Sequence, residues 1–122
     1  MNALRKLYKE LTSLHWEIGF LDNTFEGIVR GDKLKLTLVT HNFPNSWFAD
    51  PFILDVTDDT IIVLVEEVTK KISKGRISKL VIDRRNNYVI EKKVILERPG
   101  HLSFPIIYRK DDKIYVYPEN SE

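Results

Sequence analysis

The chain has 122 residues, of which 43% are hydrophobic and 30% are charged, and these proportions are typical of one soluble globular domain. Its 19 lysine and arginine residues nearly balance its 18 aspartate and glutamate residues, and a net charge of +1 argues against nucleic-acid binding. The absence of cysteine excludes disulfides, thiolate zinc sites and a cysteine nucleophile. No apolar run approaches the roughly 20 residues of a transmembrane segment. The N-terminus also lacks the apolar core of a signal peptide, so we expect a cytoplasmic protein.

The first predicted element is a short amphipathic helix over residues 2–14. Its apolar residues recur at three- and four-residue steps, the spacing of one helical face. They are Leu4, Leu7, Tyr8, Leu11 and Leu14. We expect this face to dock on the body of the domain, and a helix lying on a membrane surface is the alternative.

After Trp16 the pattern predicts short β-strands joined by turns, and therefore an all-β fold. The expected strands cover residues 16–21, 33–40, 48–55, 61–68, 76–83, 88–96, 104–108 and 113–117, with a loop over 22–32. Polar and apolar side chains alternate with period two in 33–40, as they do in a half-buried strand.

Two stretches of the chain resemble each other at a period near 53 residues. Pro51 and Pro105 each stand at the start of an apolar strand and lie 54 residues apart, while Glu66 and Glu119 follow at an offset of 53. A period of this length with four strands per unit predicts a β-propeller, with a full blade over 48–96 and the start of a second over 101–122. The chain then holds about one and a half blades, with a few strands before them. Chance similarity between hairpins is the alternative.

The prolines indicate where a site would lie. Proline is tolerated at the first residue of a strand, where no ladder hydrogen bond is lost. Because the innermost strand of each blade starts near the propeller axis, the residues before these strands converge. We therefore expect Asp50, His101 and Ser103 to be neighbours in one pocket.

Five motifs carry a family resemblance. In chain order they are FADPF at 48–52, VEE at 65–67, KGRI at 74–77, HLSFP at 101–105 and YVYPE at 115–119. Together they resemble the N-terminal domain of the glucosamine inositolphosphorylceramide transferase family. The resemblance implies a five-bladed propeller related in architecture to furanosidase-type glycoside hydrolases. It also implies carbohydrate chemistry in polysaccharide or glycoconjugate biosynthesis.

The chain departs from the family pattern at two positions. Phe104 stands where the family usually has tyrosine, and Asn120 stands where it has a small hydroxyl residue. Propeller glycosidases also place an aspartate at the head of the second blade, where this chain has 101–104 (HLSF). A hydrolase inferred from the fold alone would lack one of three carboxylates, which argues against plain hydrolysis.

Two carboxyl groups are the candidate catalytic residues, because glycosyl chemistry commonly uses one acid and one base or nucleophile. Asp50 is the candidate base, and Glu119 is the candidate acid or a ligand of sugar hydroxyls. The alternative for Asp50 is a turn aspartate that caps its own backbone.

Five further residues are candidates for substrate binding. Glu66 and Glu67 are adjacent on one strand and point to opposite faces, so one can face the axis and we expect the other to be solvated. His101 and Ser103 are candidate hydrogen-bonding groups, without the third residue of a triad. Trp47 is a candidate to stack on a sugar ring, with core packing as the alternative.

We predict no metal and no cofactor, since the three histidines have no ligand spacing. A basic cluster at Lys70, Lys71, Lys74 and Arg76 is either a solvated loop or a phosphate contact. The expected partner is a sugar, nucleotide-sugar or glycolipid, and unpaired strand edges predict self-association. Two alternatives remain: a non-catalytic sugar-binding or scaffold module, and a fragment without independent activity.

Overall fold

The computed structural model describes residues 3–12 and 15–121. In chain order they form α1 (Ala3–Thr12), β1 (Gly19–Leu21), α2 (Phe25–Arg30), β2 (Leu36–Leu38), β3 (Ser46–Val56), β4 (Thr60–Thr69), β5 (Arg76–Asp83), β6 (Tyr88–Leu96), β7 (His101–Lys110) and β8 (Lys113–Ser121). All pairs within the sheets are antiparallel. The predicted all-β fold is confirmed, and among the described residues no sheet closes on itself, as expected of a partial propeller.

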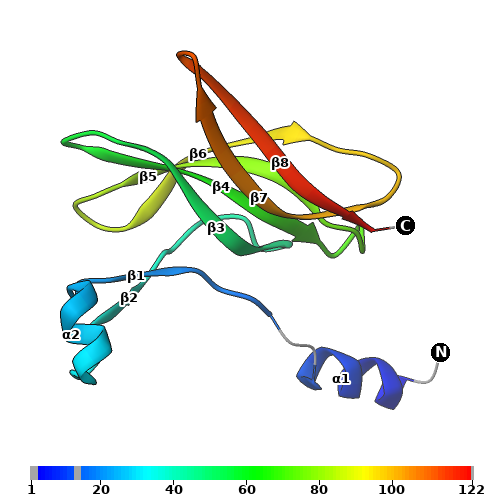
Figure 1. The fold of residues 1–122 in the computed structure, drawn as a ribbon. Helices are drawn as coiled ribbons and strands as arrows, with labels where there is room; N and C mark the ends of the chain where they lie inside the picture. The colour runs from blue at the N-terminus through cyan, green and yellow to red at the C-terminus, as the bar shows by residue number, and fades with distance from the viewer. Residues whose placement is uncertain (1–2, 13–14, 122) are drawn as a thin grey trace.

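The centre of the molecule is a four-stranded sheet in the order β3-β4-β5-β6, which is the meander of a propeller blade. The hairpin β7-β8 crosses one face of this sheet, and β1 and β2 lie below it in the view of Figure 1. No helix among the described residues has the length and apolar character needed to cross a membrane.

The side chains of a strand alternate between the two faces of its sheet, and each face of the blade carries a cluster of buried apolar side chains. On one face Val63 and Val65 of β4 pack in a cluster that includes Ile18 and Val39 from the N-terminal segment. On the other face a second cluster joins the blade to the β7-β8 hairpin. It contains Leu64, Ile77 and Leu102, with Leu54, Leu96, Ile107 and Val116 packed around them. The blade is thus the middle layer of three.

The sequence repeat is present in the backbone as a repeated bulge. The β3-β4 register shifts between Ala49 and Phe52, and the β7-β8 register shifts between Ser103 and Ile106. The residue before each proline, Asp50 and Phe104, has a φ of 48°. Two hairpins with the same bulge, the same φ and the same proline are repeats of one unit, which favours the propeller interpretation over chance similarity.

The prediction of a loop over 22–32 was wrong, because α2 forms within it. Thr24 caps this helix by accepting a hydrogen bond from the Gly27 N–H at 3.1 Å, and Gly31 ends it with a φ of 87°. A threonine N-cap followed by a left-handed glycine is the local signal that the sequence carries for this helix.

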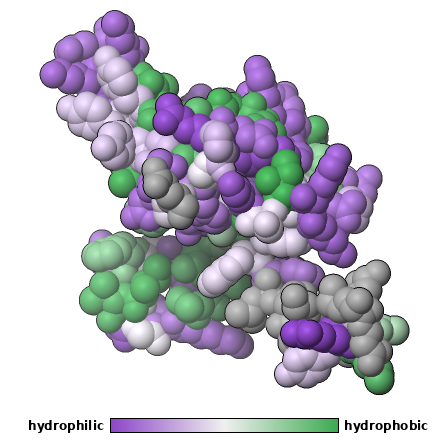
Figure 2. Space-filling view, turned by 90° about the vertical axis from the view of Figure 1, so that its right-hand side faces the viewer, coloured by the Kyte–Doolittle hydropathy of each residue, from purple (hydrophilic) through white to green (hydrophobic). Residues whose placement is uncertain are grey.

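The predicted strand 33–40 is reduced to β2, and its three leucines are not buried, although Val39 is part of the core. Leu34, Leu36 and Leu38 are 56%, 60% and 47% exposed. Since β2 pairs with β1 in a sheet of two short strands, no further layer covers this face in the described part of the chain. Figure 2 shows hydrophobic residues gathered in the lower part of the molecule, where the N-terminal elements lie.

The N-terminal helix forms, but the prediction that it docks on the domain was wrong. Leu4 and Leu7 are 73% and 53% exposed, and Figure 1 shows α1 set apart from the sheets. The side chains of Leu11 and Leu14, which complete the predicted apolar face, lie outside the described residues.

Candidate functional site

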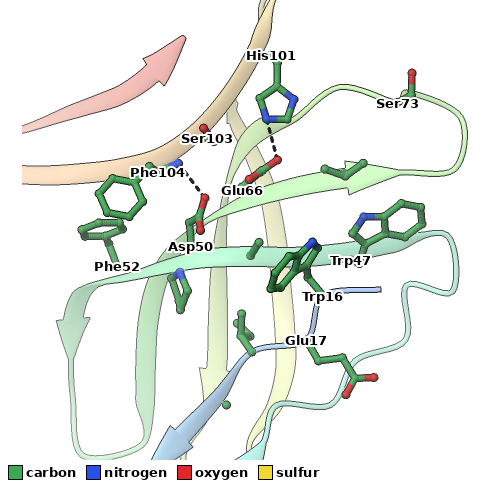
Figure 3. A pocket seen from close by; sticks show the side chains of 15 residues that line it. Trp16, Glu17, Trp47, Asp50, Phe52, Glu66, Ser73, His101, Ser103 and Phe104 are labelled. Atoms are coloured by element: carbon green, nitrogen blue, oxygen red, sulfur yellow. Dashed lines mark hydrogen bonds and ion pairs between the residues drawn. The ribbon is translucent and has the colours of Figure 1, made fainter. Parts of the chain in front are cut away.

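A pocket of about 920 Å³ lies where β3 and β4 of the blade meet the start of β7. Its lining includes Trp16, Glu17, Trp47, Asp50, Phe52, Glu66, Ser73, His101, Ser103 and Phe104. Residues from β3, β4 and β7 thus meet at one place, together with the segment before β1 (Figure 3).

Asp50 lies on the bulge of β3, where positive φ is uncommon for residues other than glycine but is tolerated by aspartate. Its Oδ2 accepts a hydrogen bond from the Phe104 N–H at 3.3 Å. Asp50 is therefore bonded to the corresponding bulge of the next repeat.

Glu66 points into the same pocket from β4, in register with Ala49 on β3. It is buried, with 9% of its surface exposed, and its carboxyl group lines the pocket together with that of Asp50. Burial raises the pKa of Glu66 to about 7, and the hydrogen bond to Asp50 and the negative charge of Asp50 add to this effect. Near neutral pH a substantial fraction of Glu66 is therefore protonated.

His101 is the second hydrogen-bonding partner of Glu66, with Nε2 3.1 Å from Oε1 (Figure 3). The other ring nitrogen, Nδ1, accepts a hydrogen bond from the Gly75 N–H at 2.9 Å. A backbone N–H can only donate, so Nδ1 carries no proton. His101 is therefore neutral and donates its Nε2–H to Glu66, which makes the contact a hydrogen bond and not an ion pair.

The structure places Ser103 and Trp47 at the pocket, together with a tryptophan that the sequence reasoning missed. Trp47 is half-buried and its ring lies 5.2 Å from that of His15. Trp16 is 63% exposed although it is large and apolar. An exposed tryptophan beside carboxyl groups offers a flat surface for a ligand. The sequence signal for Trp16 is that a large aromatic residue stands shortly before the short strand β1.

Glu67 points to the opposite face of β4, and the prediction that one of the two glutamates is solvated was wrong. Its side chain is fully buried and accepts four hydrogen bonds. The donors are Ser46 Oγ at 2.8 Å, Ser78 Oγ at 2.6 Å, Arg76 Nε at 3.2 Å and Lys92 Nζ. Burial alone would raise the pKa of Glu67, but the bonds from Lys92, Ser78, Arg76 and Ser46 outweigh it and lower the pKa to about 2. Glu67 is thus an ionised part of the blade's interior.

Glu119 does not line this pocket. It is exposed on β8, in register with Ser103 on β7, just as Glu66 is in register with Ala49. Glu119 therefore occupies in the second repeat the position that Glu66 occupies in the first.

The basic cluster at the β4-β5 loop and the start of β5 does not line the pocket, and part of it is bonded within the protein. Arg76 contacts Glu67 and, at 3.5 Å, Glu97, while Lys74 Nζ bonds to the Pro99 carbonyl. No lysine or arginine is among the described residues that line the pocket. The pocket is therefore acidic and aromatic.

Comparison with known protein families matches residues 35–122 to the family described as glucosamine inositolphosphorylceramide transferase 1, N-terminal. Comparisons with curated proteins and with solved structures gave no significant match. The family match covers β2 to β8, and so includes the blade, the second hairpin and every pocket residue from Trp47 onward. The family's name connects it with glycosyl transfer in glycolipid biosynthesis. The chain belongs to the family of the N-terminal domain of glucosamine inositolphosphorylceramide transferase 1.

Proposed function

We propose that this chain is a carbohydrate-active propeller domain of glycoconjugate biosynthesis that binds a sugar in the pocket between the two repeats. One observation carries the proposal: the carboxyl groups of Asp50 and Glu66 line one pocket, which Trp16 and Trp47 flank. Carboxyl groups accept hydrogen bonds from sugar hydroxyls, and indole rings pack against the apolar faces of sugar rings.

The charge of the pocket favours the glycosyl part of a substrate over its phosphate part. Three carboxyl groups line it, those of Glu17, Asp50 and Glu66, and no lysine or arginine does so among the described residues. A phosphate would meet uncompensated negative charge there. A nucleotide-sugar or glycolipid would therefore enter with its sugar, leaving the phosphate outside.

Asp50 and Glu66 are proposed to act as one acid–base unit. Glycosidases hold their two carboxyl groups roughly 5–10 Å apart, with the scissile bond between them. The predicted second carboxyl group of such a pair, Glu119, does not line the pocket, so hydrolysis of that type is disfavoured here. As a unit Asp50 and Glu66 can accept the proton that a sugar hydroxyl loses when its oxygen forms a new bond. His101 would stabilise the resulting charge on Glu66 through its Nε2–H.

A non-catalytic sugar-binding module is the second candidate, and the position of Glu119 favours it. The predicted acid lies outside the pocket, so the described residues supply the proton-accepting unit without a separate acid for a leaving group. In this case the domain would present a sugar to a partner transferase.

Sugar titrations and turnover assays test both candidates. We would titrate the protein with glucosamine, N-acetylglucosamine, glucose and inositol by NMR, and assay glycosyl transfer from nucleotide-sugar donors. Asp50→Asn and Glu66→Gln are expected to weaken sugar binding about tenfold each, while Asp58→Asn, in the β3-β4 turn, leaves it unchanged. If none of these sugars binds, the proposal fails. Binding that depends on Asp50 without any turnover would establish the module instead.

Self-association and a cytoplasmic location stay predictions. Among the described residues β8 pairs with β7 alone, and Tyr117 on β8 is 77% exposed. An unpaired edge of this kind invites another strand. Sedimentation velocity over a concentration series would detect the association. A single species with the sedimentation coefficient of a monomer at all concentrations would exclude it.

A further inference from the structure

Gly75 lies at the point where the blade meets the second hairpin. It directly precedes β5, and both of its backbone polar groups bond to the beginning of β7. Its N–H donates to His101 Nδ1 at 2.9 Å, and its carbonyl accepts the Leu102 N–H at 2.9 Å. One buried residue thus ties the β4-β5 loop to β7.

The first of these bonds determines which ring nitrogen of His101 carries the proton. Because the Gly75 N–H occupies Nδ1, the neutral ring must carry its proton on Nε2. That nitrogen is 3.1 Å from Glu66 Oε1. The main chain at Gly75 therefore determines that Glu66 faces a hydrogen-bond donor on this side, within the pocket that it lines together with Asp50.

Only glycine fits at position 75. A Cβ there would meet the Leu102 carbonyl oxygen and would lie 2.6 Å from Glu66 Oε1 and 2.9 Å from His101 Cε1. Carbon–oxygen and carbon–carbon contacts this short do not occur without displacement of one group. Any larger residue would therefore push apart the two side chains that the Gly75 N–H brings together.

We propose that Gly75 is a positioning residue of the pocket, which holds His101 in the Nε2–H tautomer and thereby orients the Glu66 carboxyl group within the pocket that it shares with Asp50. The inference rests on the proposed function in one respect, that sugar binding uses the Asp50–Glu66 unit. The tautomer and the orientation of Glu66 are properties of the free protein. They can be measured with no sugar present.

The first experiment is NMR of the full chain labelled with ¹⁵N-histidine, with His101 assigned by its loss in His101→Gln. At pH 7 we expect an unprotonated Nδ1 and a protonated Nε2. In Gly75→Ala we expect loss of this single tautomer and a changed ¹³C shift of the Glu66 carboxyl group. Gly27→Ala is the control, since a Cβ at Gly27 meets only side-chain atoms of Asp32 and Thr24, at 3.1 Å or more. A wild-type His101 with a protonated Nδ1 at pH 7 would overturn the proposal whether or not a sugar binds.

A pair of histidine variants keeps the proposal testable if Gly75→Ala does not fold. In His101→Gln the side-chain amide nitrogen can take the place of Nε2–H and donate to Glu66, whereas the shorter side chain of His101→Asn cannot reach it. With glucosamine as the probe, we expect His101→Gln to bind within about threefold of wild type and His101→Asn to bind about tenfold more weakly. Equal losses in both variants, with unchanged Glu66 ¹³C shifts, would overturn the positioning role. Absence of glucosamine binding in the wild type would count against the proposed function and leave the tautomer measurement to decide the inference.

Discussion

Replacing Glu67 by glutamine removes a buried carboxylate while keeping its size and its place on β4. The carboxylate has two cationic partners, Lys92 and Arg76, and two serine donors, Ser46 and Ser78. Glutamine would keep a carbonyl oxygen for some of these donors but would bring an NH₂ group toward the others. The two cations would be left without their shared counter-charge.

The pKa shift of Glu67 gives the expected size of the loss in the free energy of unfolding. The pKa falls from an ordinary value of 4.5 to about 2 on folding. Since each pKa unit corresponds to about 1.4 kcal/mol, ionised Glu67 contributes roughly 3 kcal/mol to the free energy of unfolding. Loss of one partner from a buried ion pair typically costs 3–5 kcal/mol, which is in agreement. We therefore expect Glu67→Gln to lower the free energy of unfolding at pH 7 by ~3 kcal/mol.

The pH dependence distinguishes this explanation from simple disruption of packing. A carboxyl group with a depressed pKa contributes its full stability above pH 4.5 and loses it as the pH falls toward 2. The difference between wild type and Glu67→Gln should therefore shrink over this window, as measured by urea unfolding followed by tryptophan fluorescence. Glu91→Gln is the control, because Glu91 pairs with Lys79 at the surface, where such pairs contribute at most about 1 kcal/mol. A loss in Glu67→Gln that matched the control, or that stayed constant from pH 7 to pH 2.5, would refute the reasoning.

Three further predictions follow from the same contacts. Because the pKa of Glu66 is raised to about 7, the folded state binds more protons than the unfolded state between pH 4.5 and 7, so wild-type stability falls as the pH rises through this window. Glu66→Gln should remove that fall and be more stable than wild type at pH 8 by about 2–3 kcal/mol, and parallel pH profiles in urea unfolding would contradict this. Leu102→Ala should cost about 2–5 kcal/mol in the same assay, because Leu102 is 1% exposed between the blade and the second hairpin, whereas Ile106→Ala, at a side chain 42% exposed, should cost under about 1 kcal/mol. Trp16→Ala should leave the melting temperature nearly unchanged but weaken glucosamine binding severalfold, and unaltered binding would exclude Trp16 from the site.

The sequence was most informative where the structure is local or repeated. Alternating apolar residues and turn residues predicted β3 to β6 closely and the central parts of β7 and β8, because hairpins form between neighbouring segments. The internal repeat also predicted which distant residues lie close together. It placed Asp50, His101 and Ser103 together across more than 50 residues, and the structure places all three at one pocket.

Features that depend on distant segments could not be predicted. Trp16 reaches the pocket because the N-terminal segment packs across the blade, which no local pattern encodes. The donors of Glu67 come from positions 9 to 25 residues away along the chain, so its burial is evident only in the folded sheet. The role of Gly75 likewise depends on the approach of β7.

The repeated bulge at Pro51 and Pro105 keeps the same backbone conformation in both repeats, although different side chains stand on it. Asp50 and Phe104 adopt the same φ at equivalent places, so the neighbouring strands and not the side chain impose that backbone conformation. Such a position tolerates an acid in one repeat and an aromatic ring in the next, where Phe104 packs edge-on to Phe52 at 5.0 Å. A single substitution at either bulge would add or remove one negative charge at the mouth of the pocket while the strand order stayed the same. Equivalent positions of the two repeats can therefore differ in charge and in contacts while the fold stays the same.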